Sequence, residues 1–369
     1  MRVAIAGGGT AGHVNPALAL AEALQGCEVT FLGTATGAEA RLVPDAGWPL
    51  EVVEVRGWDR ARPASFPLVG AVAVRALATA RSVLRRFGAD VVVGMGGYVS
   101  LPACLAARSL GTPIVLHEQN IVFGLANRVC KPVASAVAVS FRESLKSAGR
   151  RGVFVGNPIR AEIANADHPS ERARGLHHFA LEEGRRTLLV FGGSQGARRI
   201  NTAAAELRAR WSRRSDLQVL HVTGSPDAQG GEADPGVGLL YRAVPFVDRM
   251  IEAYSVADVA LCRGGATTVA ELQAVGLPAI IVPYPHHRDR QQELHARVLE
   301  RAGAAIALPD ASASGGTVAG HADRLLGDPD ERARMRSAAL GLATPDAAER
   351  LAGIAKEASA RARGKGPRP

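Results

Sequence analysis

The stretch "RVAIAGGGTAGHVNPALAL", residues 2–20, decides the fold of the first half of the chain. A short apolar run, VAIA, is followed by Gly7, Gly9 and Gly12 and then by a histidine. A strand that ends in a glycine-rich turn and continues as a helix is the opening of a Rossmann-like unit. The glycine spacing also fits G-x-G-x-x-G, so the turn predicts either a dinucleotide site or another anion site that begins in the same way.

Two observations argue against a dinucleotide site. The nicotinamide fingerprint needs an acidic residue at the end of the second strand, but "VTFLGTATG" (29–37) has no Asp or Glu at its tip. No Lys followed by Ser or Thr comes after the glycines, so a Walker A loop is excluded as well. His13 instead begins a predicted helix, where the helix dipole disfavours imidazolium and leaves a neutral ring that can accept a proton. From the residues alone, His13 is either a general base or a histidine that caps its helix.

Strand-like runs alternate with helical segments along the whole chain, which is typical of α/β units around parallel sheets. The pattern restarts near Arg186, after a polar stretch at 165–186. We therefore predict two Rossmann-like domains, at 1–160 and 161–344, whose parallel sheets face each other across a cleft. The expected strands lie in "RVAIAG", "CEVTFLG", "LEVVEV", "ADVVVGMGG", "TPIVLHEQN" and "SAVAVS", and then in "RTLLVFGGS", "LQVLHVTG", "GLLYRAVPF", "ADVALCRGG", "PAIIVPYP" and "AAIALPD".

Four glycine-rich turns follow predicted strands, at "AIAGGGTAGH", "GMGGYVS", "LLVFGGSQGA" and "CRGGATTVAEL". Glycine lets the backbone approach a ligand closely, and the helix that follows offers unpaired N–H groups to an anion. Parallel strands end at one edge of their sheet, where α/β proteins bind ligands. The four turns therefore predict ligand sites at that edge.

The charge of the chain is uneven. The 369 residues carry a formal net charge of +9; residues 1–160 hold 17 Lys and Arg against 10 Asp and Glu, and residues 161–358 hold 23 against 25. A basic first half suggests an anionic surface or substrate, although an Arg-rich composition would give the same count. Nucleic acid is not an expected partner, because neither an aromatic platform nor a helix-turn-helix pattern accompanies the high isoelectric point.

Cysteine spacing and hydropathy exclude further classes of protein. The four cysteines have no C-x-x-C spacing, so neither a zinc site nor a disulfide framework is expected and a reducing compartment is indicated. A strand-like segment begins at Arg2, which leaves no room for a signal peptide. The longest apolar stretch, at 66–80, is interrupted by Arg75 and is too short to span a membrane.

Seven motifs occur in order between residues 2 and 355: "GGGTAGHVNPALALAEAL", "GMGGYVSLPA", "LHEQN", "VGNPIR", "FGGSQGARRIN", "CRGGATTVAEL" and "PYPHHRDRQQ". In this order they resemble the MurG family of peptidoglycan glycosyltransferases. The resemblance implies a GT-B fold and an inverting transferase that needs neither metal nor cofactor. The implied donor is UDP-N-acetylglucosamine, and the implied acceptor is undecaprenyl-diphospho-muramyl pentapeptide (lipid I). The product would be lipid II with a new β-1,4 bond.

The resemblance also assigns roles to residues. His13 would be the catalytic base, and Ser194, within the turn Gly192 to Gln195, would help to stabilise the departing diphosphate. Glu271 would hold the ribose and Val247 would lie against uracil. By motif match, the acceptor diphosphate would bind Thr10, Gly12, Gly96, Gly97 and Tyr98, and UDP-N-acetylglucosamine would bind Thr10, Ala11, Gly12, Asn120, Arg160, Ser194, Val247, Ala266, Thr267, Thr268, Glu271 and Gln292.

Simpler interpretations stay open for several of these residues. Glu271 could be an exposed helix carboxylate, and Arg160 could be a solvated charge in the linker. Asn120 could serve, together with Glu118, only to close a strand-to-helix turn.

Two further points concern the second domain. Gln291 and Gln292 are adjacent, so only one of them can point into the site, and family spacing favours Gln292. Asp328-Pro-Asp330 resembles a metal-binding D-x-D motif, but its place at a helix start predicts an N-cap instead. No metal site is expected.

The chain departs from the family pattern at three positions. Ala11 stands where the first turn usually has glycine, and its methyl group could crowd a diphosphate unless its φ is negative. Gly264 stands where serine is common, and His295 stands where asparagine is usual. None of the three removes a residue on which the mechanism depends.

Residues 66–87 predict an amphipathic helix. It could lie on an anionic bilayer, or it could be a crossover helix packed on the sheet. The resemblance favours the bilayer, with the protein peripheral on the cytoplasmic face of the bacterial membrane and cell-wall synthesis proteins as candidate partners. The apolar residues at helical spacing are Val69, Val72, Ala76, Ala80, Val83 and Phe87, with Arg75, Arg81, Arg85 and Arg86 interleaved.

The end of the chain is predicted in two parts. By the resemblance, a last helix at 345–357 packs back onto the first domain. Residues 358–369 are expected to form a disordered basic tail.

Two other functions stand as alternatives to the transferase. A UDP-N-acetylglucosamine 2-epimerase has a similar architecture, but it would need catalytic acids and does not share this motif set. A non-catalytic sugar-nucleotide-binding scaffold at the membrane would not need His13, Glu271 and Gln292.

Overall fold

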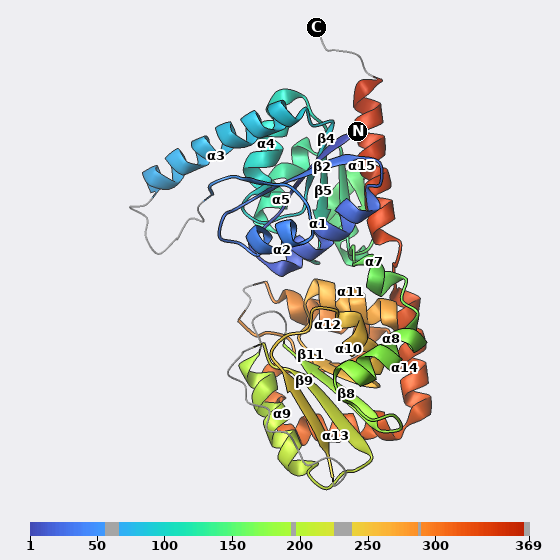
Figure 1. Cartoon of the computed structure of the whole chain (residues 1–369). Helices are drawn as coiled ribbons and strands as arrows, with labels where there is room; N and C mark the ends of the chain where they lie inside the picture. Colours follow the sequence, from blue (N-terminus) through green and yellow to red (C-terminus); the bar gives the residue numbers. More distant parts are fainter. Residues whose placement is uncertain (56–65, 193–196, 225–237, 287–288, 365–369) are drawn as a thin grey trace. The chain divides into compact units, whose positions relative to one another are not determined.

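The computed structural model describes residues 1–55, 66–192, 197–224, 238–286 and 289–364, with the backbone alone at 66–71. The chain divides into two compact units. Unit 1 comprises Met1–Arg160 and Pro345–Pro369, and unit 2 comprises Ala161–Thr344. Each unit is a twisted parallel sheet with helices on both faces (Figure 1).

Over the described residues, unit 1 has a seven-stranded sheet in the order β3-β2-β1-β4-β5-β6-β7. The order reverses between β1 and β4, which are paired with Val3 opposite Val91 and Ala6 opposite Gly94. At such a reversal the loops that follow the two strands run to opposite sides and leave room for a ligand. The strands are β1 (Arg2–Ala6), β2 (Glu28–Gly33), β3 (Leu50–Val52), β4 (Val91–Gly94), β5 (Ile114–Glu118), β6 (Ala136–Val139) and β7 (Gly152–Phe154).

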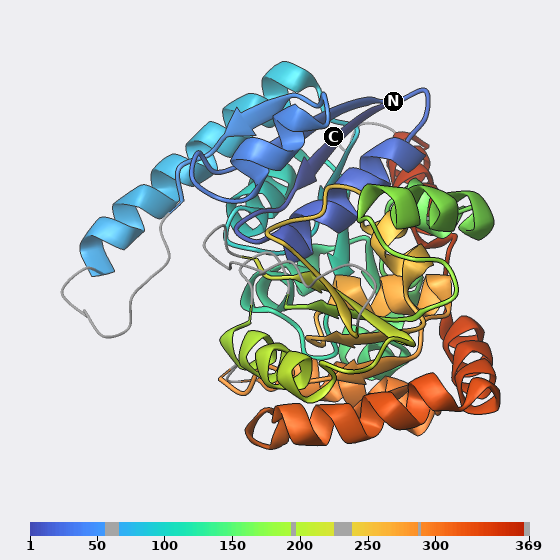
Figure 2. The same ribbon diagram turned by 60° about the horizontal axis from the view of Figure 1, so that its bottom comes forward.

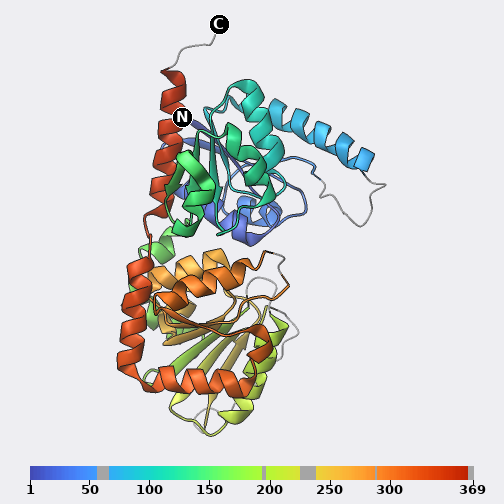
Figure 3. The same ribbon diagram turned by 180° about the vertical axis from the view of Figure 1, so that it is seen from behind.

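The two faces of β1 are buried under different helices. Ala4 and Ala6 belong to a core with α3 and α4, whereas Val3 and Ile5 belong to a core with α1 and α15. Because both faces are covered, the strands are continuous apolar runs rather than alternating ones. Figure 3 shows α15, in red, running alongside unit 1. The helices of four or more residues are α1 (Ala11–Ala23), α2 (Glu39–Asp45), α3 (Phe66–Phe87), α4 (Ser100–Leu110), α5 (Leu125–Cys130), α6 (Leu145–Ala148) and α15 (Ala347–Arg363).

Helix α3 begins and ends where the sequence pattern predicts. Its first turns project away from the rest of unit 1 (Figures 1 and 2), and its later part packs against α4. Ala76, Ala80 and Val83 are buried there, so this part of the apolar stripe faces the protein and not a bilayer. The crossover-helix alternative therefore holds for residues 76–83. The side chain of Val69 lies outside the described residues.

Unit 2 repeats the architecture, with a six-stranded parallel sheet, over the described residues, in the order β10-β9-β8-β11-β12-β13. Its main core is built from β8, β9, α9 and α13, around Leu188, Val219, Ile200 and Val318. The strands are β8 (Arg186–Phe191), β9 (Leu217–Val222), β10 (Leu240–Val244), β11 (Val259–Cys262), β12 (Ala279–Ile281) and β13 (Ala305–Ala307). The helices are α7 (Ala161–Ala164), α8 (His168–His178), α9 (Arg198–Arg210), α10 (Met250–Val256), α11 (Ala266–Val275), α12 (Gln291–Arg301), α13 (Gly315–Gly327) and α14 (Pro329–Leu342).

The structure corrects two predictions and confirms a third. Strand β7 was not expected, because three residues at a sheet edge give too short an apolar run. The disordered tail was predicted to begin at 358, but α15 continues to Arg363, where Ala358 is buried and Arg363 pairs with Asp90 at 2.6 Å. Asp328 is the predicted N-cap, since its carboxylate accepts a bond from the backbone N of Glu331 at 2.9 Å.

Helix α15 supplies part of the core of unit 1, so we expect Leu351→Ala to destabilise that unit. Leu351 is fully buried among side chains of β1, β4 and α1. Removing a buried leucine side chain costs about 2–5 kcal/mol, because the cavity is only partly refilled. Urea unfolding measures the loss. The matched control is Arg350→Ala, at an exposed residue of the same turn that pairs with Asp346, and it should cost about 0.5 kcal/mol or less.

Candidate active site

The carboxyl ends of β1 and β4 bring two glycine turns into contact in unit 1. A Cβ added to Gly97 would lie 2.3 Å from the carbonyl oxygen of Gly8, and one added to Gly7 would lie 2.9 Å from the Cβ of Met95. Gly96 and Gly97 also have φ of +91° and +79°, which side chains rarely adopt. The two turns can therefore approach only because they lack side chains.

His13 lies directly beside this contact. It is the third residue of α1, and its imidazole Nε2 would be 3.1 Å from a Cβ at Gly96. Thr10, the N-cap residue, places its Oγ1 3.2 Å from His13 Nδ1. Burial lowers the pKa of His13, and the carboxylate of Glu39 only partly offsets this. The ring is therefore neutral at pH 7, and when Nδ1–H donates to Thr10, Nε2 is free to accept a proton.

The start of α1 also shows how Ala11 is accommodated. Thr10 and Gly12 are exposed and Ala11 is half-buried at the first position of α1. Among the described residues, only Ala180 and Arg290 have positive φ without being glycine, so Ala11 carries no backbone strain. Tyr98, at the end of the second turn, is 68% exposed.

Asn120 makes the contacts of a turn-closing residue. Glu118, which ends β5 and is almost fully buried, accepts bonds from the backbone N and the Nδ2 of Asn120 at 3.1 and 3.3 Å. It also accepts from the backbone N of Gly124 and from Asn127. Contact of Asn120 with a ligand stays a prediction.

A buried polar network behind the turns was missed in the sequence. His117 has no exposed surface and lies 3.1 Å from the carbonyl oxygen of Gly156 through Nε2. Its Nδ1 lies 3.2 Å from Gln119, whose amide in turn donates to the carbonyl of Met95 at 2.7 Å. Burial lowers the pKa of His117 to about 4, so this ring is neutral too. His117 and Gln119 both lie in "LHEQN" (116–120), where only Asn120 was predicted to contact a ligand.

In unit 2, the turn after β8 cannot be compared with its predicted role. Ser194 and the rest of 193–196 lie outside the described residues. Helix α9 begins shortly after, at Arg198, so a helix start does follow this strand. Arg160, the last residue before unit 2, is half-buried.

The turn after β11 places four predicted residues on one helix. Ala266, Thr267 and Thr268 are the first three residues of α11, and all are half-buried. Glu271 follows on the next turn and accepts a 2.7 Å hydrogen bond from the hydroxyl of Tyr254. Burial and this carboxylate raise the pKa of Tyr254 well above its usual value, so the phenol stays a donor. Glu271 is therefore a fixed, half-buried acceptor and not an exposed helix carboxylate.

Val247, predicted to meet uracil, follows β10 and is only 5% exposed. Its neighbour Phe246 is 54% exposed, which makes it the more accessible apolar surface of this loop. Nothing in the sequence distinguishes the two, because both are apolar residues at a strand end.

The two adjacent glutamines at the start of α12 point differently. Gln291 is buried and its amide donates to Asp289 at 3.2 Å. Gln292 is half-buried, and its side-chain oxygen accepts a 2.9 Å bond from the backbone N of Tyr284. This bond engages the oxygen of the Gln292 amide and not its NH₂ group. Contact of Gln292 with a ligand stays a prediction.

Two of the three departures from the family pattern touch each other. His295 is buried, and its Nδ1 lies 2.9 Å from the carbonyl oxygen of Gly264. Burial lowers the pKa of His295 to about 4, so a neutral ring donates this bond. A Cβ at Gly264 would lie 2.7 Å from the backbone oxygen of Gln292. Gly264 and His295 thus form one packing unit that sets the first turn of α12.

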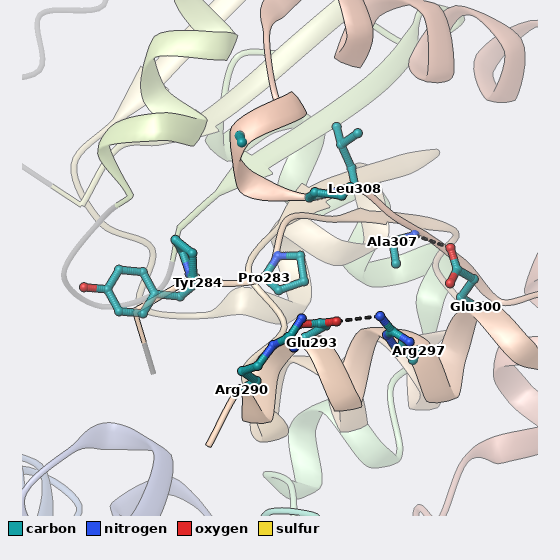
Figure 4. Close-up of a pocket in the computed structure, with 11 residues that line it drawn as sticks. Pro283, Tyr284, Arg290, Glu293, Arg297, Glu300, Ala307 and Leu308 are labelled. Carbon is teal, nitrogen blue, oxygen red and sulfur yellow. Dashed lines mark hydrogen bonds and ion pairs between the residues drawn. The ribbon is translucent and has the colours of Figure 1, made fainter. Parts of the chain in front are cut away.

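A cavity of about 490 Å³ lies beside Tyr284 in unit 2. Figure 4 shows Arg290, Glu293, Arg297 and Glu300 along one wall. Glu293 accepts bonds from Arg290 and Arg297, both at 2.6 Å, so its charge is neutralised within the wall. The described residues that line the cavity include none of those predicted for substrate binding.

The described part of the chain holds neither a metal cluster nor a membrane span. No group of three or more His, Cys, Asp and Glu side chains is placed there to hold a metal ion. No helix within those same residues is long and apolar enough to cross a membrane.

Two parallel α/β units with glycine turns at the carboxyl ends of their strands are the architecture of the GT-B glycosyltransferases. Residues 3–139 match the glycosyltransferase family 28 N-terminal domain, and residues 187–351 match the family 28 C-terminal domain. The chain is 44% identical over 365 residues to a Nocardioides protein named UDP-N-acetylglucosamine–N-acetylmuramyl-(pentapeptide) pyrophosphoryl-undecaprenol N-acetylglucosamine transferase. The match covers 97% of this chain and 98% of the relative.

A solved structure of a glycosyltransferase is also similar to this chain over almost its whole length. The crystal structure of MurG from Acinetobacter baumannii is 29% identical, with a TM-score of 0.75, and the match covers 96% of this chain and 99% of that one. The chain therefore belongs to the MurG family of N-acetylglucosamine transferases, and the predicted GT-B fold is confirmed. A UDP-GlcNAc 2-epimerase from Neisseria meningitidis, with a TM-score of 0.66 over 98% of this chain and 100% of that one but only 11% identity, shares the fold alone.

The packing unit of Gly264 and His295 yields a prediction. We expect Gly264→Ser to cost about 1–3 kcal/mol, because its Cβ must push the Gln292 carbonyl away. Adding His295→Asn should lose less than the sum of the two single losses, since the smaller side chain lets α12 move. Shifts in the thermal unfolding midpoint across the double-mutant cycle measure the coupling. Gly265→Ser is the matched control, because the nearest atom to its Cβ is 3.6 Å away. Additive losses would contradict the prediction.

Proposed function

We propose that this chain transfers N-acetylglucosamine from UDP-N-acetylglucosamine to lipid I and so forms lipid II in peptidoglycan synthesis. The observation that carries the proposal is a neutral imidazole, His13, fixed by Thr10 beside two contacting glycine turns, in a chain that belongs to the MurG family. The fold alone would not suffice, since it is shared with an epimerase.

In the proposed reaction, a hydroxyl of the acceptor's muramyl sugar attacks the anomeric carbon of the donor from the side opposite UDP. The new bond joins this oxygen to the anomeric carbon as the bond from that carbon to the phosphate oxygen breaks. Nε2 of His13 takes the proton, and the configuration inverts to give the β-1,4 bond. A neutral imidazole suits this role, because it can bind the proton as the hydroxyl becomes more acidic.

Unit 1 is proposed to hold the acceptor diphosphate. Thr10 and Gly12 begin α1, and Gly96, Gly97 and Tyr98 form the neighbouring turn. Support comes from the helix dipole at α1 and from the exposure of Thr10, Gly12 and Tyr98.

Unit 2 is proposed to hold the donor. Glu271 would accept hydrogen bonds from the ribose hydroxyls. The bond from Tyr254 supports this role, because it holds the carboxylate in a fixed orientation. The start of α11 and the NH₂ group of Gln292 would contact the sugar. Val247, with Phe246 beside it, would meet uracil. Ser194, Arg160, Asn120 and Ala11 complete the set inferred from the family motifs. The departing diphosphate would be stabilised by backbone N–H groups, without a metal.

The first prediction for this function concerns His13. With radiolabelled UDP-N-acetylglucosamine, a short-chain lipid I analogue and EDTA, the wild type should form labelled lipid II. His13→Ala should lower kcat by about 10²- to 10⁴-fold, because a general base contributes that much. His177→Ala, which changes an exposed histidine on α8, is the matched control and should leave the rate unchanged.

Each other outcome of that assay has a distinct meaning. Transfer that survives in His13→Ala would keep the enzyme but move the base elsewhere. No transfer by the wild type, with UDP-sugar binding intact, would favour the non-catalytic scaffold. Conversion of the free UDP-sugar to its 2-epimer would favour the epimerase.

We further propose that unit 1 contacts an anionic membrane surface from the cytoplasmic side. Support comes from exposed apolar side chains on two helices that contact each other, namely Leu105 on α4 and Leu125 and Val129 on α5. Arg108 and Arg128, both exposed, lie on the same two helices. An apolar patch with basic neighbours binds anionic bilayers by burial and charge together. Cell-wall synthesis proteins remain candidate partners.

For the membrane surface we expect the double variant Leu125→Glu/Val129→Glu to reduce sedimentation with vesicles that contain anionic lipid. The two carboxylates remove apolar area and add repulsion from the lipid headgroups. Leu340→Glu, at a 44% exposed leucine of unit 2, is the matched control and should bind as the wild type does. Unchanged sedimentation of the double variant would reject this surface.

A further inference from the structure

Glu39 is a fully buried carboxylate for which neither the sequence nor the proposed reaction provides a role. It is the first residue of α2, and its carboxylate joins two loops of unit 1. Oε2 accepts a bond from the backbone N of Gly9 at 2.8 Å. Oε1 accepts from the backbone N and the Oγ1 of Thr34 at 2.8 and 2.6 Å. The side chain therefore ties the turn after β1 to the loop after β2.

The surrounding backbone is shaped to admit this carboxylate. A Cβ at Gly8 would lie 2.3 Å from Oε1 of Glu39, and one at Gly37 would lie 2.2 Å from Oε2. Gly9 has φ of +94°, and a Cβ there would meet no described atom within 4 Å, so its glycine serves conformation rather than space. Two of the glycines around the turn thus make room for a protein carboxylate and not for a ligand.

We propose that Glu39 is a positioning residue for His13. It fixes the Gly7–Gly9 turn in the conformation from which α1 begins, and it holds a negative charge in the neighbourhood of the imidazole. The inference rests on the proposed function, in which His13 takes the proton of the acceptor. It also implies that the N–H of Gly9 is already engaged, so the phosphate donors of this turn begin at Thr10.

The charge balance around His13 supports this role. Burial opposes ionisation of Glu39, but the bonds from Thr34 and Gly9 outweigh it and lower the pKa of the carboxyl, which is therefore charged at pH 7. That charge raises the pKa of His13 against the larger effect of burial. His117 of β5 also interacts electrostatically with His13, and burial keeps its ring neutral. Helix α15, which packs on α1, contributes apolar side chains such as Leu351 and Ala355 to the shared core.

The test is Glu39→Gln in the transfer assay. The amide oxygen can satisfy Thr34, but the NH₂ group then faces the N–H of Gly9, so the turn loses its acceptor. We expect kcat/KM for the acceptor to fall by about 10- to 100-fold, as when a reacting group is misplaced. Without the negative charge the imidazolium is less stable, so the pKa of His13 falls. In a plot of kcat/KM against pH, the acidic limb, where His13 becomes protonated, should therefore move to lower pH.

The matched control is Thr34→Val. It removes the hydroxyl's bond to Glu39 and the bond that this hydroxyl accepts from the backbone N of Gly37. It keeps the carboxylate and its bond to Gly9, so the acidic limb should stay at the wild-type pH. If both variants lose activity and neither moves the limb, Glu39 is merely structural and the proposal is overturned. An unchanged kcat/KM in Glu39→Gln would overturn it as well.

Two further measurements keep the test decisive. If Glu39→Gln does not fold, Glu39→Asp keeps the charge but is one methylene too short to reach both loops. It should lower kcat/KM with the limb in place, and wild-type kcat/KM would overturn the positioning role. Transfer by the wild type and its loss in His13→Ala are measured in parallel. Failure of those two results would count against the proposed function itself, whereas their success with an unmoved limb would count only against Glu39.

Discussion

The carbonyl oxygen of Gly8 occupies the space that a side chain of residue 97 would need, and this contact fixes the edge of unit 1. It brings the turns that follow β1 and β4 close together, at the place where the strand order reverses. The ring of His13 also lies close to Gly96, where an added Cβ would come within 3.0 Å of the imidazole and where φ is +91°. The geometry of the proposed base thus depends on missing side chains as much as on those present.

Buried polar groups support this edge from behind. Glu39 holds the first turn through Gly9, and Gln119 holds the second turn through the carbonyl of Met95. Burial makes such bonds strong and their loss costly, since an unpaired polar group in the interior loses its hydration without compensation. Each turn is therefore anchored by a buried side chain from a neighbouring loop. The anchors differ in charge, and the carboxylate of Glu39 also acts on the basicity of His13.

Unit 2 also contains buried side chains that hydrogen-bond to neighbouring loops and helices. Tyr254 donates to Glu271 in the middle of α11, and His295 of α12 donates to the carbonyl of Gly264 before α11. A side chain of α11 and the turn before this helix are therefore fixed from within the unit. Both donors are buried, and burial keeps each in its neutral form, the phenol by raising its pKa and the imidazole by lowering it. Neutral donors can orient neighbouring groups without adding charge to their surroundings.

The sequence by itself determined the architecture, the number of units and the motifs of the site, because strand runs, glycine turns and helix starts are local patterns. It could not reveal β7, whose three residues carry too little signal, or the end of α15, which is set by Ala358 in the core and Arg363 against Asp90. It also left open whether Glu271 is exposed and whether Gly264 and His295 are connected. Only the tertiary structure decided these points and the place of Glu39, since burial and contact join residues that are far apart along the chain.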